Sequence, residues 1–145
     1  MIIETEKKIN IRCRGIIVHE GKLLVVRHAP NDVFFALPGG HLEWGEKIND
    51  CFKREMVEEL GINPQVGRLL YINNIFDEGR QSIEFFFEIL NSADYLDIEK
   101  LGGTHKFELA EICWVGKDDN KKILPDQIQT DLNNNTLLSD TVRFI

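Results

Sequence analysis

The sequence predicts one domain of the α+β class over residues 1–145. Apolar, β-rich segments stand near the start of the chain, one charged segment with helical spacing follows, and further β-rich segments come after it. A chain of 145 residues in which 43% are hydrophobic and 28% are charged can bury the core of such a domain. The order of strands and helices is therefore mixed, and no internal repeat or linker divides it.

The first two strands are expected to form a hairpin. Ile11–His19 is rich in β-favouring residues, and Lys22–Arg27 is a second apolar run. Glu20-Gly21 between them suits a tight turn. The two segments are therefore expected to pair with each other.

A helix is expected from about Glu46 to Leu60. A carboxylate such as Glu46 is favourable at the positive end of a helix dipole, so helix stabilisation is as good an explanation of this residue as catalysis. At the other end, Gly61 suits a left-handed cap and Pro64 prevents the helix from continuing. Upstream, Leu37-Pro38-Gly39-Gly40 is expected to form a sharp loop that leads into the helix.

After this helix the sequence predicts two long strands, one short strand, a second helix and a strand at a sheet edge. A polar turn at residues 77–80 joins the long strands, and residues 91–104 are rich in loop-forming residues. The expected ranges, in order, are Val66–Phe76, Ser82–Leu90, Ile112–Val115, Asp126–Asn134 and Thr141–Ile145.

Three glutamates in the first helix predict a metal site. Glu55, Glu58 and Glu59 stand at i, i+3 and i+4, so a helix places them on one face. Three like charges there oppose folding unless a cation neutralises them. Ligands that are all oxygen favour Mg²⁺, with Mn²⁺ as the alternative, over Zn²⁺ or Cu²⁺. For an isolated acidic triplet, a solvated helix face would be the ordinary explanation.

The residues around the triplet complete a longer pattern. Arg54 precedes Glu55 and can orient or neutralise that carboxylate through its planar fork. The run fits G-x5-E-x7-R-E-U-x-E-E-x-G-U, where U is apolar, at Gly40, Glu46, Arg54, Glu55, Met56, Glu58, Glu59, Gly61 and Ile62. This pattern is the Nudix box, and the chain closely resembles the Nudix hydrolase family.

The resemblance implies an α/β/α sandwich with a mixed β-sheet. It also implies Mg²⁺-dependent hydrolysis of a diphosphate linkage in a nucleoside diphosphate joined to another group. Arg54, Glu55, Glu58 and Glu59 would be the catalytic residues, with Glu55, Glu58, Glu59 and the carbonyl of Gly40 as metal ligands. An ordinary turn is an equal explanation of Gly40.

The box leaves the substrate open among nucleoside triphosphates, ADP-ribose, dinucleoside polyphosphates and sugar nucleotides. A Nudix domain that senses a nucleotide or metabolite without cleaving it is the alternative function, and a structural interaction domain is a third. The intact set of Arg54 and three glutamates favours catalysis over the sensing domain, and loss of metal binding despite good folding would indicate the structural one.

Substrate-binding residues outside the box are harder to assign. Guanidinium groups bind phosphate in a bidentate manner, and aromatic side chains can stack on a base. Each candidate also has an ordinary explanation as a surface or core residue. The main candidates are Arg14, Arg27, Arg80 and Trp44, and further ones are Arg12, Phe34, Phe35 and Phe76. Glu108 or Glu111 could supply an extra acid, and His105 could act as a base. The other histidines, His19, His28 and His41, are expected to be ordinary ones.

Bulk properties limit the partners. The formal net charge of −7 disfavours a long nucleic acid, whereas a local basic pocket can still bind a small nucleotide. Cys13, Cys51 and Cys113 form no C-x-x-C pair, so reduced cysteines are expected. The starting segment lacks the apolar stretch of a signal peptide, and no run of about 20 apolar residues occurs. We expect a cytoplasmic protein without membrane contact, and a homodimer is compatible with the sequence.

Overall fold

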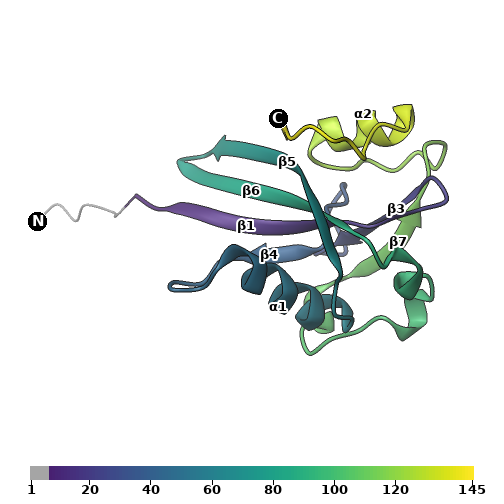
Figure 1. Ribbon diagram of the computed structural model, residues 1–145, viewed down its shortest axis with the longest axis horizontal. Helices are drawn as coiled ribbons and strands as arrows, with labels where there is room; N and C mark the ends of the chain where they lie inside the picture. Colours follow the sequence, from purple (N-terminus) through teal and green to yellow (C-terminus); the bar gives the residue numbers. More distant parts are fainter. Residues whose placement is uncertain (1–6) are drawn as a thin grey trace, which may run out of the picture.

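Two helices enclose two β-sheets in the computed structural model, which describes residues 7–145 (Figure 1). The larger sheet has five strands in the order β4-β1-β6-β5-β8, and the smaller has three in the order β2-β3-β7. The strands of the larger sheet are β1 (Ile9–Ile16), β4 (Gly39–His41), β5 (Val66–Asp77), β6 (Arg80–Ile89) and β8 (Arg143–Phe144), and those of the smaller are β2 (Val18–His19), β3 (Lys22–Arg27) and β7 (Glu111–Val115).

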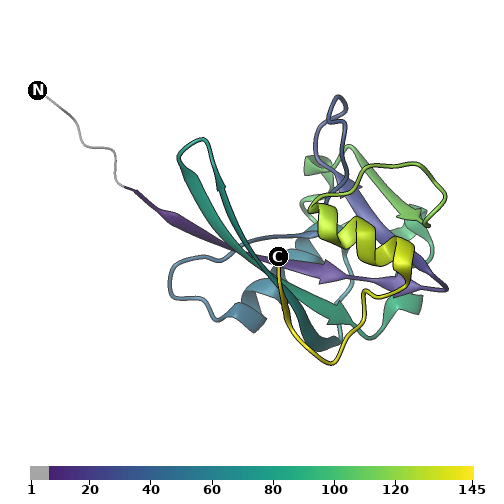
Figure 2. The ribbon, with the colours of Figure 1, turned by 90° about the horizontal axis from the view of Figure 1, so that it is seen from above.

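The larger sheet is mixed. β1 runs parallel to β6 and antiparallel to β4, while β5 is antiparallel to β6 and parallel to β8. The β5–β6 hairpin extends beside β1 and away from the second helix, as Figure 2 shows. The mixed sheet between two helices confirms the predicted fold class.

The helices cover opposite sides of the sheets (Figure 1). α1 (Ile48–Leu60) packs Cys51, Phe52 and Met56 into one hydrophobic core, and α2 (Asp126–Asn134) packs Ile128 and Leu132 into another. Between β6 and β7 the chain forms three short 3-10 helices, Ser92–Tyr95, Ile98–Lys100 and Lys106–Glu108. Among residues 7–145, no helix is both long enough and apolar enough to cross a membrane.

Strand β1 shows how the two cores are separated. Cys13 and Ile17 belong to the core under α1, whereas Ile16 belongs to the core on the α2 side. Side chains alternate between the two faces of a strand, so Arg12 and Arg14 share the face of Ile16. One strand therefore separates the helix-packing face from a face that carries two arginines.

The predicted hairpin at the start of the chain is largely wrong. Only Val18–His19 pairs with β3, because the chain leaves the larger sheet at Ile17 and enters the smaller one. Most of the segment Ile11–His19 is β1, whose partners are β4 and β6. A single β-rich run in the sequence thus contributes one strand to each of the two sheets.

The loop before α1 also differs from the prediction. Gly39–His41 forms an edge strand against β1, and α1 begins at Ile48, two residues after Glu46. Gly39 has φ +146°, and a Cβ there would lie 1.9 Å from the carbonyl oxygen of Cys13. Only glycine permits the backbone to follow β1 this closely.

Candidate active site

Several of the candidate residues from the sequence line a cavity of about 420 Å³ beside β4. Helix α1 supplies three carboxylates, and strands β1 and β4 supply two arginines, two glycines and a histidine. His28 follows β3, and His105 and Glu108 lie at the two ends of the third 3-10 helix. The lining residues are Arg12, Arg14, His28, Gly39, Gly40, His41, Glu55, Glu58, Glu59, His105 and Glu108.

Arg54 holds the acidic residues in place. Its Nη1 donates to Glu55 Oε1 at 2.9 Å and to Glu58 Oε2 at 3.1 Å. Its Nη2 donates to the carbonyl oxygen of His41 at 3.0 Å, which ties α1 to the end of β4. The predicted orienting role of Arg54 therefore has a geometric basis.

Glu46 is a partner of Arg54 and does not line the cavity. Its carboxylate accepts from Arg54 Nε at 2.7 Å and Nη2 at 2.9 Å, a two-pronged ion pair. These bonds lower the pKa of Glu46 to about 2. Another bond, from the backbone N–H of Glu43 at 3.1 Å, fixes the turn before α1. Glu46 thus orients the arginine that orients the other carboxylates.

Glu59 has a different environment from its neighbours. It is 4% exposed, and within the described residues its Oε2 has no hydrogen-bond partner. Burial raises the pKa of Glu59 to about 8 and also raises that of Glu55, although Arg54 acts on Glu55 in the opposite sense. A buried carboxylate oxygen without a partner is costly, and a ligand in the cavity can satisfy it.

Gly40 allows β4 to approach the acidic helix. A Cβ at this position would lie 2.2 Å from Glu55 Oε2. Any larger residue would displace either the strand or the carboxylate. The glycine is therefore required for close packing against Glu55, whatever its carbonyl oxygen binds.

The last turn of α1 is capped by a distant loop. The backbone N–H groups of Gly102, Gly103 and His105 donate to the carbonyl oxygens of Leu60, Glu59 and Glu58 at 3.0, 3.4 and 2.7 Å. These carbonyls would otherwise lack intrahelical partners. Capping also brings His105 Nδ1 to 3.2 Å from Glu58 Oε2 and places Glu108 at the cavity.

The residues present fit a hard divalent cation by their donor chemistry. Glu55, Glu58, Glu59 and the backbone of Gly40 offer oxygen atoms, and Glu59 Oε2 is buried without a partner in the described part of the chain. Across residues 7–145, however, no three acidic, histidine or cysteine side chains are close enough together to hold a metal ion. Arg54 bonds Oε1 of Glu55 and Oε2 of Glu58, so the second oxygen of each carboxylate lies outside its pairing with the arginine.

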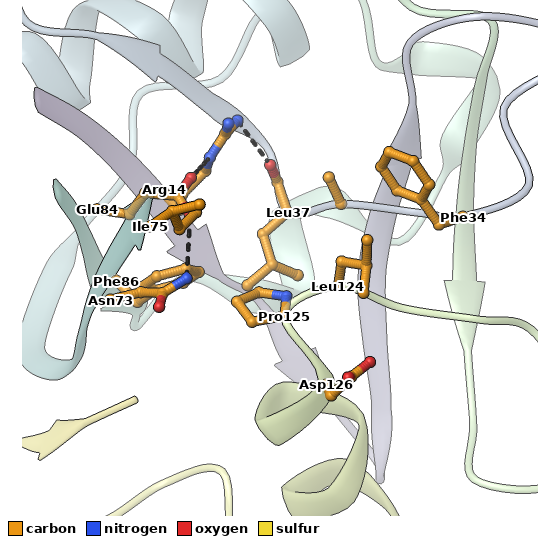
Figure 3. Close-up of a pocket in the computed structure, with 11 residues that line it drawn as sticks. Arg14, Phe34, Leu37, Asn73, Ile75, Glu84, Phe86, Leu124, Pro125 and Asp126 are labelled. Carbon is orange, nitrogen blue, oxygen red and sulfur yellow. Dashed lines mark hydrogen bonds and ion pairs between the residues drawn. The ribbon is translucent and has the colours of Figure 1, made fainter. Parts of the chain in front are cut away.

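A second cavity of about 400 Å³ adjoins the first at Arg14 (Figure 3). Arg14 is buried, and its Nε donates to Glu84 Oε2 at 2.8 Å while its Nη1 donates to the carbonyl oxygen of Leu37 at 3.2 Å. Asn73 Nδ2 donates to the other oxygen of Glu84 at 3.4 Å. The remaining walls are largely apolar and come from Phe34, Ala36, Leu37, Ile75, Phe86, Leu124 and Pro125, with Asp126 at the start of α2.

Comparison with known proteins identifies the family. Residues 10–132 match the family described as the NUDIX domain, which is most of the chain. The chain belongs to the NUDIX domain family. An ADP-ribose pyrophosphatase of Methanocaldococcus jannaschii is 34% identical over 82 residues, which are 52% of this chain and 48% of that protein. The match thus spans about half the length of that curated relative.

Solved structures show the same fold. A MutT NUDIX hydrolase from Burkholderia pseudomallei is 22% identical, with a TM-score of 0.67 over 87% of this chain and 97% of that one. An ADP-ribose pyrophosphatase from Streptococcus suis is 19% identical, with a TM-score of 0.63 over 94% and 98%. At these identities the likeness concerns the architecture of the NUDIX domain alone.

Three of the predicted substrate-binding residues lie away from both cavities of this NUDIX domain. Arg27 pairs with Glu111 at 3.1 Å and also bonds the carbonyl oxygen of Pro30. Trp44 is fully exposed in the loop before α1, and Arg80 is exposed at the start of β6. Arg14 is the predicted residue that the structure does bring to the site.

Sequence reasoning named His105 as a candidate base but took His28 and His41 for ordinary histidines. His28, His41 and His105 line the first cavity, whereas His19 is near Ser92, with 3.4 Å between Nδ1 and Oγ. Burial lowers the pKa of His28 and His41, and nearby arginines act in the same direction. The pairing of β4 with β1 is the signal that would have found His41, because it lies opposite Arg12.

The structure also separates the two candidate acids outside the box. Glu108 lines the cavity, whereas Glu111 is paired with Arg27 on the smaller sheet. Of the aromatic candidates, Phe34 lines the second cavity, Phe35 is buried in a core and Phe76 is exposed on the β5–β6 hairpin. The three cysteines are free.

Proposed function

We propose that this NUDIX domain is a divalent-metal-dependent hydrolase that cleaves a diphosphate linkage in a nucleoside diphosphate joined to another group. The proposal rests on one observation: a single cavity is lined by carboxylates of α1 and by arginines of β1. These residues are Glu55, Glu58 and Glu59 on α1, and Arg12 and Arg14 on β1. Acidic residues of this kind suit a cation, and arginines suit the phosphate that the cation accompanies. The relative named as an ADP-ribose pyrophosphatase supports the same chemistry.

The residues that would hold Mg²⁺ or Mn²⁺ are Glu55 and Glu59 first, with Glu58 and the carbonyl of Gly40. A metal bound there would neutralise diphosphate charge and lower the pKa of a water molecule. Glu59 is suited to this ligation because its unpartnered oxygen is already buried in the described structure. Arg54 and Glu46 keep the carboxylates oriented.

The reaction is a displacement at phosphorus. A water oxygen forms a bond to one phosphorus atom, the bond from that phosphorus to the bridging oxygen breaks, and the bridging oxygen leaves with the second phosphate. The proton released by the water passes to the adjacent carboxylates of α1, which titrate and act together. Two phosphorylated fragments result.

The second cavity is suited to the nucleoside end of the substrate. Its apolar walls and few polar groups are typical of a small-molecule pocket. Arg14 lines both cavities, so a molecule whose phosphates occupy the first cavity can place its ring in the second. Phe34 and Phe86 offer aromatic surface there.

The proposal is tested with a panel of ADP-ribose, dinucleoside polyphosphates, nucleoside triphosphates and sugar nucleotides in Mg²⁺. We expect phosphorylated products from at least one substrate, and Glu59→Gln should lower turnover by about a hundredfold or more while the domain still folds. Circular dichroism and a metal-free melting curve serve as the folding control.

Two outcomes would contradict hydrolysis. Turnover that is unchanged in Glu59→Gln would remove this residue from the site. No product from any substrate, together with a raised melting temperature on adding one of them, would instead indicate a sensing domain.

A further inference from the structure

Arg12 is a cation without a counter-ion in the described structure. It is partly buried on β1 and lines the same cavity as the carboxylates of α1. Within residues 7–145, its Nε is buried without a hydrogen-bond partner and no carboxylate forms an ion pair with it. A charged group removed from water without a partner costs free energy, so this guanidinium is suited to an anion from outside the chain.

Neighbouring charges increase that cost. Burial lowers the pKa of Arg12, and the charge of Arg14 lowers it further, while Glu84 acts in the opposite direction. Glu84 is already bonded to Arg14 at 2.8 Å and to Asn73 at 3.4 Å. Glu84, the carboxylate that acts on the pKa of Arg12, is thus already paired with Arg14.

The two arginines of β1 therefore have different roles. Both lie on one face of the strand, but Arg14 is bonded to Glu84 and to Leu37, which fixes it as part of the wall. Arg12 has its donors available. His41 stands directly opposite Arg12 in the β1–β4 register and lines the same cavity, so a third nitrogen-bearing side chain faces this space.

We propose that Arg12, with His41 beside it, binds a phosphate group of the substrate and is the anion-binding element of the site. A guanidinium can donate two parallel hydrogen bonds to a phosphate, and binding would give Arg12 the counter-charge that it lacks. The inference rests on the proposed function only in identifying this phosphate as part of the diphosphate that is cleaved. Arg12 binds substrate, whereas Arg14 positions the wall.

The test uses the full chain and inorganic pyrophosphate with Mg²⁺ as the probe. Isothermal titration calorimetry compares the wild type with Arg12→Gln, Arg12→Lys and the control Lys53→Gln, whose lysine is exposed on α1. We expect Arg12→Gln to weaken pyrophosphate binding by about tenfold or more and Arg12→Lys by less, because lysine keeps the charge but loses the fork. Lys53→Gln should bind as the wild type does.

Two further measurements distinguish binding from a structural role. A titration with Mg²⁺ alone should give an affinity for Arg12→Gln no weaker than that of the wild type. The metal-free melting temperature of Arg12→Gln should not fall, since the change removes an unpaired cation. Unaltered pyrophosphate binding in Arg12→Gln, or a marked fall in its melting temperature, would overturn the proposal.

Kinetics separate this inference from the proposed hydrolysis. With a substrate from the panel, Arg12→Gln should raise KM more than it lowers kcat. Hydrolysis with an unchanged KM would refute the role of Arg12 and leave the hydrolase intact. Pyrophosphate binding that depends on Arg12, without hydrolysis of any substrate, would refute the hydrolase and support the anion site.

Discussion

At the scale of single residues, two glutamates of the box respond to their surroundings in opposite ways. Arg54 lowers the pKa of Glu46 to about 2 by bonding its carboxylate, whereas burial raises that of Glu59 to about 8. The sequence presents both as glutamates of one motif. Their difference arises from which of them the arginine reaches and which the fold encloses.

The raised pKa of Glu59 predicts how stability of the metal-free protein changes with pH. The folded state favours the neutral carboxyl, so this group's contribution is fully present below its usual pKa of 4.5 and is lost as pH rises through about 8. Between those values the free energy of unfolding should fall by roughly 5 kcal/mol because of this residue, since each unit of pKa shift corresponds to about 1.4 kcal/mol. Urea denaturation in EDTA at several pH values measures the fall.

Glu59→Gln is the matched variant for that experiment. Glutamine cannot ionise, so the free energy of unfolding of the variant should fall much less as pH rises. The variant should be at least as stable as the wild type at pH 8. Parallel stability profiles of the two proteins would show that Glu59 does not carry a raised pKa.

Gly40 predicts a metal-binding defect without unfolding. In Gly40→Ala the new methyl group would meet Glu55 Oε2 at 2.2 Å, so the carboxylate must move. We expect Mg²⁺ affinity, measured by calorimetry, to fall about tenfold to a hundredfold, the range for disturbing residues that orient metal ligands. Gly116→Ala is the control, because its Cβ would meet no atom closer than 3.6 Å. Equal affinities in the two variants would contradict the role of Gly40.

At the scale of elements, α1 depends on a loop far from it in the sequence. Gly61 ends the helix in the left-handed conformation that the sequence predicted, with φ +79°, and its N–H donates to the carbonyl oxygen of Val57. The cap that Gly102, Gly103 and His105 add could not be predicted, because a loop's docking partner leaves no local pattern. The same limit explains why β4 was taken for a turn and why His41 was missed.

Gly103 tests that cap. A Cβ there would lie 2.0 Å from the carbonyl oxygen of Val57, which is backbone and cannot turn aside. Gly103→Ala should therefore lower the free energy of unfolding by about 1–3 kcal/mol, while Gly116→Ala changes it little. Chemical denaturation provides the comparison, and equal stability of the two variants would show that the loop does not pack on the helix end in solution.

At the scale of the whole molecule, the box identified the family and most elements had a local signature. Strands β3, β5, β6 and β7, both helices and the C-terminal edge strand follow the predicted segments closely. The division of the first β-rich run between two sheets had no such signature, because it depends on pairing with β6, more than 60 positions along the chain. Arg14 was expected to bind phosphate, and its burial against Glu84 could be known only from that pairing.

The Arg14–Glu84 pair links the wall of both cavities to the larger sheet. Both residues are buried, so removing one leaves the other as an uncompensated charge. Glu84→Leu should lower the free energy of unfolding by about 3–5 kcal/mol, whereas the double variant Arg14→Met/Glu84→Leu should recover most of that loss. A double-mutant cycle by urea denaturation measures the coupling, and strictly additive losses would mean that the pair is not formed.

The alternation of β1 has an evolutionary consequence. One face of the strand is packed against α1, while Arg12 and Arg14 lie on the other face and reach the cavity that the carboxylates of α1 also line. Substitutions of Arg12 can change which molecule is held without disturbing the packing of α1, the helix that carries the proposed metal ligands. In a lineage descended from this protein, the choice of substrate could therefore diverge rapidly while the reaction itself stayed the same.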